Sequence, residues 1–101
     1  MDNNDNQDEP QDIQVQIPPE VQRGTYANQL VIAHSPEEFI LDFIFVTPPA
    51  GIVNSRVVIS PAHAKRMVAA LQENIIRYEA SFGEINLNSL SAMPEPKIKT
   101  H

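Results

Sequence analysis

The stretch Phe39-Ile40-Leu41-Asp42-Phe43-Ile44-Phe45-Val46 decides the fold of this chain. Successive side chains of a β-strand point to opposite faces of the sheet. The odd positions of this stretch are all large and apolar, and three of the four even positions are apolar as well. The pattern therefore predicts a strand that needs cover on both of its faces.

Further strand patterns lie on both sides of this stretch. Residues 25–34 read as a strand, and the turn residues 35–38 predict that it forms an antiparallel hairpin with 39–46. Residues 13–17 alternate apolar and polar side chains, which also predicts a strand. After a Pro-rich break at residues 47–51, a last strand is expected over 55–59.

A long helix is predicted over residues 61–82. Ser60 is a favourable N-cap, Pro61 suits the first helical position, and Gly83 supplies a residue for the C-terminal cap. Apolar residues recur at helical spacing between these caps, namely Ala64, Met67, Val68, Leu71, Ile75, Tyr78 and Phe82.

The expected fold class is therefore α+β, with a small antiparallel sheet of three to four strands followed by one long C-terminal helix. One helix covers one sheet face, and an exposed apolar face usually marks an interface. We therefore expect dimerisation to complete the fold, most simply as a symmetric homodimer. The alternative is that the segment 85–90 folds back over the second face.

The chain has 101 residues, which leaves room for one domain, and it has no Cys, which excludes disulfides and Cys-containing zinc sites. Its formal net charge is −6, and residues 1–12 carry five acidic and no basic side chains. We expect 1–12 to be a disordered acidic tail, 13–85 to be the β-β-β-α domain, and 86–101 to be a flexible C-terminal tail.

Several blocks of this sequence, taken in order, resemble one family. They are His34-Ser35-Pro36-Glu37-Glu38-Phe39, Leu41-Asp42-Phe43, Ser55-Arg56-Val57-Val58, Ser60-Pro61-Ala62-His63-Ala64-Lys65-Arg66, Leu71-Gln72-Glu73-Asn74-Ile75 and Tyr78 to Ile85. Over about residues 20–85 the chain resembles domain of unknown function 3467, a group of small prokaryotic proteins. The resemblance implies a shared shape rather than a reaction, because the family has no assigned activity. It also implies an association of some bacterial members with genes for RNA polymerase subunits.

Two sets of charged residues are candidate sites. Arg56, His63, Lys65 and Arg66 are candidates for contact with an anion or a partner, because a helix N-terminus favours phosphate or carboxylate. The alternatives are that these side chains form a solvated edge of the helix, or that Arg56 or Arg66 pairs with an acidic residue (Glu37, Glu38 or Asp42) within the dimer.

Asp42 is the second candidate, because it interrupts an apolar strand and a buried carboxylate needs a partner. A general base is possible in principle for such a residue, but we favour a structural ion pair between Asp42 and Arg56.

The three histidines, His34, His63 and His101, have no metal-ligand spacing, and the sequence has no nucleophile or phosphate-loop motif. We therefore expect no metal, no cofactor, no catalytic residue and no enzymatic activity. The expected function is a non-catalytic homo-oligomeric interaction module.

The alternative function is an accessory protein of RNA polymerase or another nucleic-acid machine, with a partner in the transcription machinery. The negative net charge disfavours direct binding to nucleic acid. The sequence has no apolar run of membrane-spanning length and no apolar leader, so we expect a cytoplasmic protein without a membrane partner.

Overall fold

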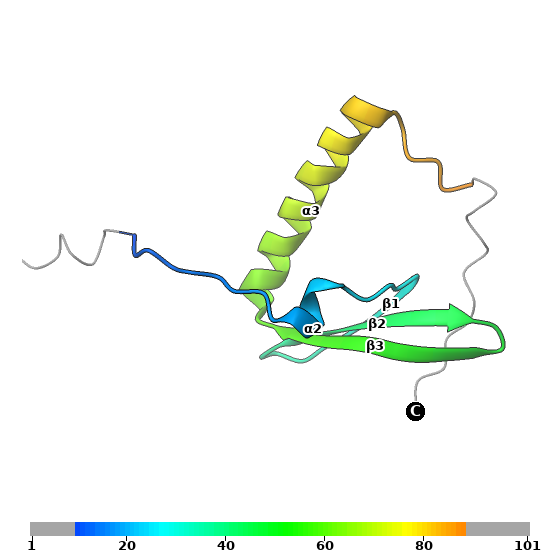
Figure 1. Cartoon of the computed structure of the whole chain (residues 1–101), viewed down its shortest axis with the longest axis horizontal. Helices are drawn as coiled ribbons and strands as arrows, with labels where there is room; N and C mark the ends of the chain where they lie inside the picture. The colour runs from blue at the N-terminus through cyan, green and yellow to red at the C-terminus, as the bar shows by residue number, and fades with distance from the viewer. Residues whose placement is uncertain (1–9, 89–101) are drawn as a thin grey trace, which may run out of the picture. The chain divides into compact units, whose positions relative to one another are not determined.

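The computed structural model describes residues 10–88, which form three strands and two helices (Figure 1). In chain order these are α2 (Pro19–Gln22), β1 (Gln29–His34), β2 (Phe39–Thr47), β3 (Ala50–Ile59) and α3 (Pro61–Phe82). The strands form one antiparallel sheet in the order β1-β2-β3, so β2 is the central strand. The predicted α+β class, an antiparallel sheet followed by a long helix, is confirmed.

The predicted strand over residues 13–17 is wrong. These residues have no regular secondary structure, and the side chains of Ile13, Val15 and Ile17 are exposed. Alternation makes a segment compatible with a strand, but a strand also needs a neighbour whose backbone groups pair with its own. The sheet that the described residues form therefore has three strands, the lower number of the predicted range.

The other two strand boundaries differ from the prediction because of specific residues. β3 starts at Ala50 rather than at residue 55, directly after the two-residue turn Pro48-Pro49. Gly51 lies close to β2 there, since a Cβ at this position would come within 3.3 Å of the Val46 Cγ2. β1 starts at Gln29 rather than at residue 25, and Asn28 directly before it contacts β2 through its backbone N–H, which donates to the Ile44 carbonyl at 3.0 Å, and through its side chain.

The two predicted tails remain predictions. Of the acidic tail 1–12, residues 1–9 lie outside the described residues, and so do residues 89–101 of the C-terminal tail 86–101. The predicted fold-back of 85–90 lies partly outside them as well.

The chain divides into two compact units, and the first holds the body of the sheet. It comprises the described residues up to Ile32 together with Leu41–Val57. Leu41 and Ile44 are the buried apolar side chains of the described chain, at 3% and 4% exposure. They are three residues apart on one strand and so lie on opposite faces of β2.

The second unit comprises Ala33–Ile40 and the described residues from Val58 onward. Its hairpin end is closed by a hydrogen bond from the Ser35 N–H to the Glu38 carbonyl at 2.9 Å. The His34 ring stacks on the Phe39 ring with centroids 5.5 Å apart. His34 is thus held at the strand end by an aromatic contact.

Helix α3 has the limits that its caps predict. The Ser60 Oγ accepts a hydrogen bond from the His63 N–H at 3.1 Å, and Pro61 occupies the first turn. At the other end Gly83 adopts a positive φ of 95°, and its N–H donates to the Glu79 carbonyl at 3.0 Å. No residue of α3 is buried, although apolar residues recur along the helix at helical spacing.

Loss of the Ser60 cap is expected to destabilise the protein. Ser60→Ala leaves the His63 N–H without its acceptor and should lower the free energy of unfolding by about 1 kcal/mol, measured by urea denaturation. Ser60→Asp keeps a side-chain acceptor at the same position and is the matched control. An Ala variant as stable as the Asp variant would show that this cap contributes nothing.

Candidate functional site

Asp42 and Arg56 form a two-point ion pair between neighbouring strands. The Arg56 Nε donates to the Asp42 Oδ1 at 2.7 Å, and the Arg56 Nη2 donates to the Asp42 Oδ2 at 2.8 Å. A planar guanidinium that meets both carboxylate oxygens in this way makes a strong, directional contact. The structure thus brings together the two residues that the sequence analysis proposed as a structural pair.

The two partners of this pair differ in their surroundings. The Asp42 side chain is 9% exposed, whereas the Arg56 side chain is 64% exposed. The hydrogen bonds from Arg56 lower the pKa of Asp42, burial opposes this effect, and the positive charge of Arg56 adds to it. The same hydrogen bonds raise the pKa of Arg56. Asp42 is therefore an ionised acceptor with both oxygens engaged, which supports the structural role over that of a general base.

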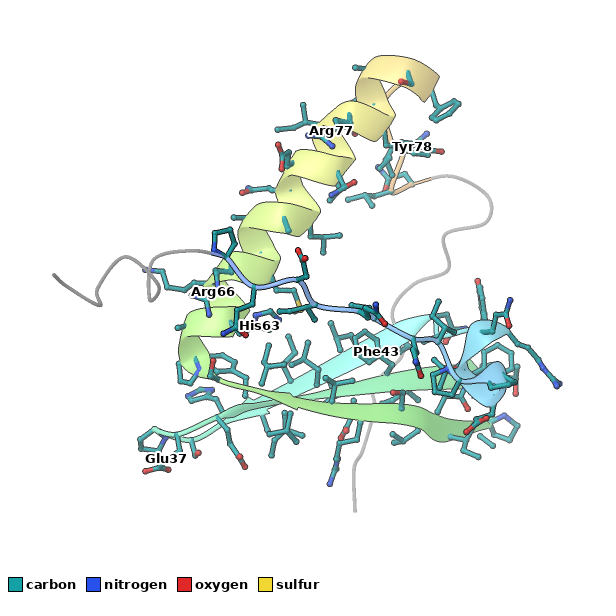
Figure 2. All side chains as sticks on the ribbon, turned by 60° about the vertical axis from the view of Figure 1, so that its left-hand side comes forward. Glu37, Phe43, His63, Arg66, Arg77 and Tyr78 are labelled. Carbon is teal, nitrogen blue, oxygen red and sulfur yellow. The ribbon has the colours of Figure 1, made fainter. Side chains whose placement is uncertain are left out.

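The basic residues His63, Lys65 and Arg66 lie on the first two turns of α3 and are exposed. Figure 2 labels His63 and Arg66 at this end of the helix and Arg77 and Tyr78 toward the other end. Arg56 belongs to the first unit and is engaged by Asp42. The anion candidate in the second unit is therefore the set of three helix residues, which we name the basic helix start.

The backbone of the basic helix start offers few donors to an anion. Pro61 has no N–H, and the N–H groups of His63 and Ala64 both donate to Ser60, at 3.1 Å and 2.9 Å. In this turn that leaves the Ala62 N–H as the donor for an incoming ligand. Any anion contact at this end would depend on the side chains rather than on a backbone cradle.

The acidic partners considered for Arg56 and Arg66 have distinct surroundings. Asp42 is occupied by Arg56, and a Glu37 carboxylate oxygen accepts a bond from the Ser35 hydroxyl at 3.4 Å. Within residues 10–88 no group of three or more His, Cys, Asp or Glu side chains could hold a metal ion. His101 lies outside the described residues.

Three polar contacts that sequence reasoning missed fix the segment before β1. The Asn28 amide donates to the Val46 carbonyl at 3.0 Å, and its Oδ1 accepts the Val46 N–H at 2.8 Å. The Asn54 amide donates to the Tyr26 carbonyl at 2.7 Å, and the Tyr26 ring meets Phe45 edge-on. The only sequence signal for these contacts is an Asn next to a strand pattern, which is also typical of turns.

Neither helix in the described part of the chain combines the length and the apolar character that crossing a membrane requires.

Replacing Asp42 by Asn is expected to change how stability depends on pH. Because the folded-state pKa of Asp42 is lowered, its stabilising effect is complete above the ordinary carboxyl value of 3.8 and is lost as the pH falls through the lowered value. Asp42→Asn should therefore unfold at a lower urea concentration than wild type at pH 7, and the difference should shrink on acidification below about pH 4.

Asp12→Asn, which makes the same substitution at an exposed carboxylate outside the helices and strands, is the charge-matched control for this experiment. It should follow the wild-type curve at each pH. If the unfolding midpoint of Asp42→Asn changed with pH in parallel to that of wild type, the ionised pair would not contribute to stability.

Comparisons with known proteins place the chain in a family. Searches of the curated proteins and of the solved structures gave no match. The family model described as "Protein of unknown function (DUF3467)" matches residues 1–87, so the match extends beyond the segment 20–85 that carries the resemblance. Since this match covers most of the 101 residues, the chain belongs to the DUF3467 family.

Proposed function

We propose that this protein is a non-catalytic interaction module that assembles with further copies of itself. The observation that carries the proposal is the number of apolar surfaces on the described chain. Ile52 and Val53 are neighbours on β3 and so face opposite sides of the sheet, and both are exposed. Val57 and Val58 repeat this arrangement.

The described residues thus carry three apolar surfaces, namely two sheet faces and one face of α3. The two faces of one sheet cannot cover each other, so within one chain α3 can cover at most one of them, and at least one of the three surfaces is left without cover from this set. Burial of apolar area stabilises a fold by roughly 25 cal/mol per Å². A chain of 11.3 kDa buries only a small core, so the loss of this apolar burial would weaken its stability considerably.

A second copy of the chain is the simplest source of the missing cover. A second copy has the same uncovered apolar surface. Two identical surfaces related by a two-fold axis bury each other in a closed assembly. This match of identical surfaces does not apply to an unrelated partner. The family match is silent on activity, since the family itself is described as one of unknown function.

Light scattering tests the proposal directly. The full chain at 10–100 µM (on the order of typical assembly affinities) should have a mass of about twice the 11.3 kDa of one chain, or a higher multiple. The mass should fall on dilution if the assembly is reversible. A mass of one chain across this range would refute the proposal.

A second candidate function is that of an accessory protein of RNA polymerase or another nucleic-acid machine, with an anion contact at the basic helix start. It is supported by the exposure of His63, Lys65 and Arg66 on one end of α3. The positive charges of Lys65 and Arg66 lie in the first turns of the helix, where the macrodipole disfavours cations, so an anionic partner would stabilise them.

Co-migration with purified RNA polymerase tests this second candidate. The double variant His63→Ala/Arg66→Ala should weaken binding by about tenfold or more. Arg77→Ala is the matched control, because it removes a charge from the other end of the same helix, where Arg77 pairs with Glu73 at 3.1 Å. Binding that is absent, or equally affected by both variants, would count against this candidate.

A further inference from the structure

Six apolar side chains of α3 recur at alternating steps of four and three residues, which is the spacing of a coiled-coil seam, while Met67 and Ile76 lie outside this set. We name this set of six residues the α3 seam: Ala64, Val68, Leu71, Ile75, Tyr78 and Phe82. The side chains of Val68 and Leu71 are each 59% exposed, and that of Phe82 is 76% exposed. No part of residues 10–88 therefore buries the seam.

The residues that flank the α3 seam are polar with one exception. Lys65, Gln72 and Glu79 follow the seam on one side, and Met67, Asn74 and Ser81 follow it on the other. A helix that covers a sheet needs a broader apolar stripe, whereas a strict seam with polar flanks is typical of contact with one other helix.

We propose that α3 pairs in antiparallel orientation with α3 of a second copy of this chain. In the register that matches all six seam residues, Leu71 lies opposite Ile75 of the second copy. Val68 then lies opposite Tyr78, and Ala64 opposite Phe82. The inference rests on the proposed self-association and assigns the surface and the orientation that it uses.

The sizes of the seam residues favour this orientation. In the antiparallel pair each layer joins a smaller side chain to a larger one, or two of equal size, as with Leu71 and Ile75. In a parallel pair each residue meets its own copy, so two alanines would face each other at one end and two phenylalanines at the other. The total side-chain volume therefore differs less between layers in the antiparallel pair than in the parallel one, and more even layers leave fewer voids between the helices.

The charges on α3 favour the same orientation. Its first turn has no acidic residue and its last turn no basic one. Basic residues occupy the beginning of the helix, and Glu79 and Glu84 lie at its end, so both groups oppose the macrodipole of their own helix. Antiparallel pairing places each group beside the opposite pole of the second helix, whereas parallel pairing would place the like-charged ends side by side.

One contact across the pair is specific. Lys65 comes to lie beside Glu79 of the second copy. Glu79 is two residues, or about 3 Å along the helix axis, from the residue of the second copy that lies directly opposite Lys65. The Glu79 Oε2 accepts the Ile85 N–H at 2.9 Å, and its other oxygen is not engaged by that bond. The two-fold axis makes this contact twice.

Cross-linking of single-cysteine variants of the full chain tests the orientation, because the chain itself has no Cys. In the antiparallel pair, position 72 lies about 3 Å along the axis from position 72 of the second copy, on the same side of the seam. The two positions 64 are about 27 Å apart. Gln72→Cys should therefore form a dimer with a short bismaleimide reagent, and Ala64→Cys should not.

The opposite result, with Ala64→Cys cross-linked and Gln72→Cys not, would show a parallel pair and overturn the proposal. If the protein is oligomeric by light scattering but neither variant is cross-linked, the α3 seam is not the contact and this inference alone fails. A monomer by light scattering refutes the proposed function as well.

Charge reversal tests the Lys65 contact separately. Lys65→Glu should raise the dissociation constant of the assembly by about tenfold, because two attractive contacts become repulsive. Arg66→Glu makes the same charge change on the outer side of the helix and is the matched control. Adding Glu79→Lys to Lys65→Glu should restore the affinity. Equal effects of Lys65→Glu and Arg66→Glu would overturn the assigned register.

Discussion

Strand β2 carries apolar side chains on both of its faces, and the rest of the structure follows from the need to cover them. β2 lies in the centre of the sheet, with β1 and β3 at its two sides. Leu41 and Ile44 are buried on opposite faces of this strand, and Asp42 between them is tolerated because Arg56 meets both of its oxygens. Large apolar side chains on β3 and α3 nevertheless stay exposed within residues 10–88.

The elements that could be predicted from the sequence are those whose signals are local. Helix α3 begins at Pro61 and ends at Phe82 as expected, because Ser60 and Gly83 determine its ends without help from the rest of the chain. The boundaries that were wrong depend on residues distant in sequence. Residues 13–17 alternate like a strand but are not in the sheet, and the contacts of Asn28 before β1 are with Ile44 and Val46 of β2.

The same distinction applies to the candidate sites. The Asp42–Arg56 pair could be inferred because a carboxylate within an apolar strand needs a cation, and Arg56 is on the next strand. Arg56 is engaged by Asp42 in that pairing, and the anion contact of Arg56, His63, Lys65 and Arg66 stays a prediction. A strand pattern gives no hint of the bond from Asn54 to Tyr26, which joins residues 28 positions apart. The pairing proposed for α3 rests on the residue spacing and charge order of that helix alone.

The connections between successive elements are short: residues 35–38 join β1 to β2, Pro48-Pro49 joins β2 to β3, and Ser60 alone separates β3 from α3. Each strand therefore pairs with the one that precedes it along the chain, so the sheet can close by steps that involve small loops. Domains with such local connectivity fold quickly, since little chain entropy is lost before contacts form. Under the proposed self-association, the encounter of two chains, and so the protein concentration, would set the rate at which the mature assembly appears.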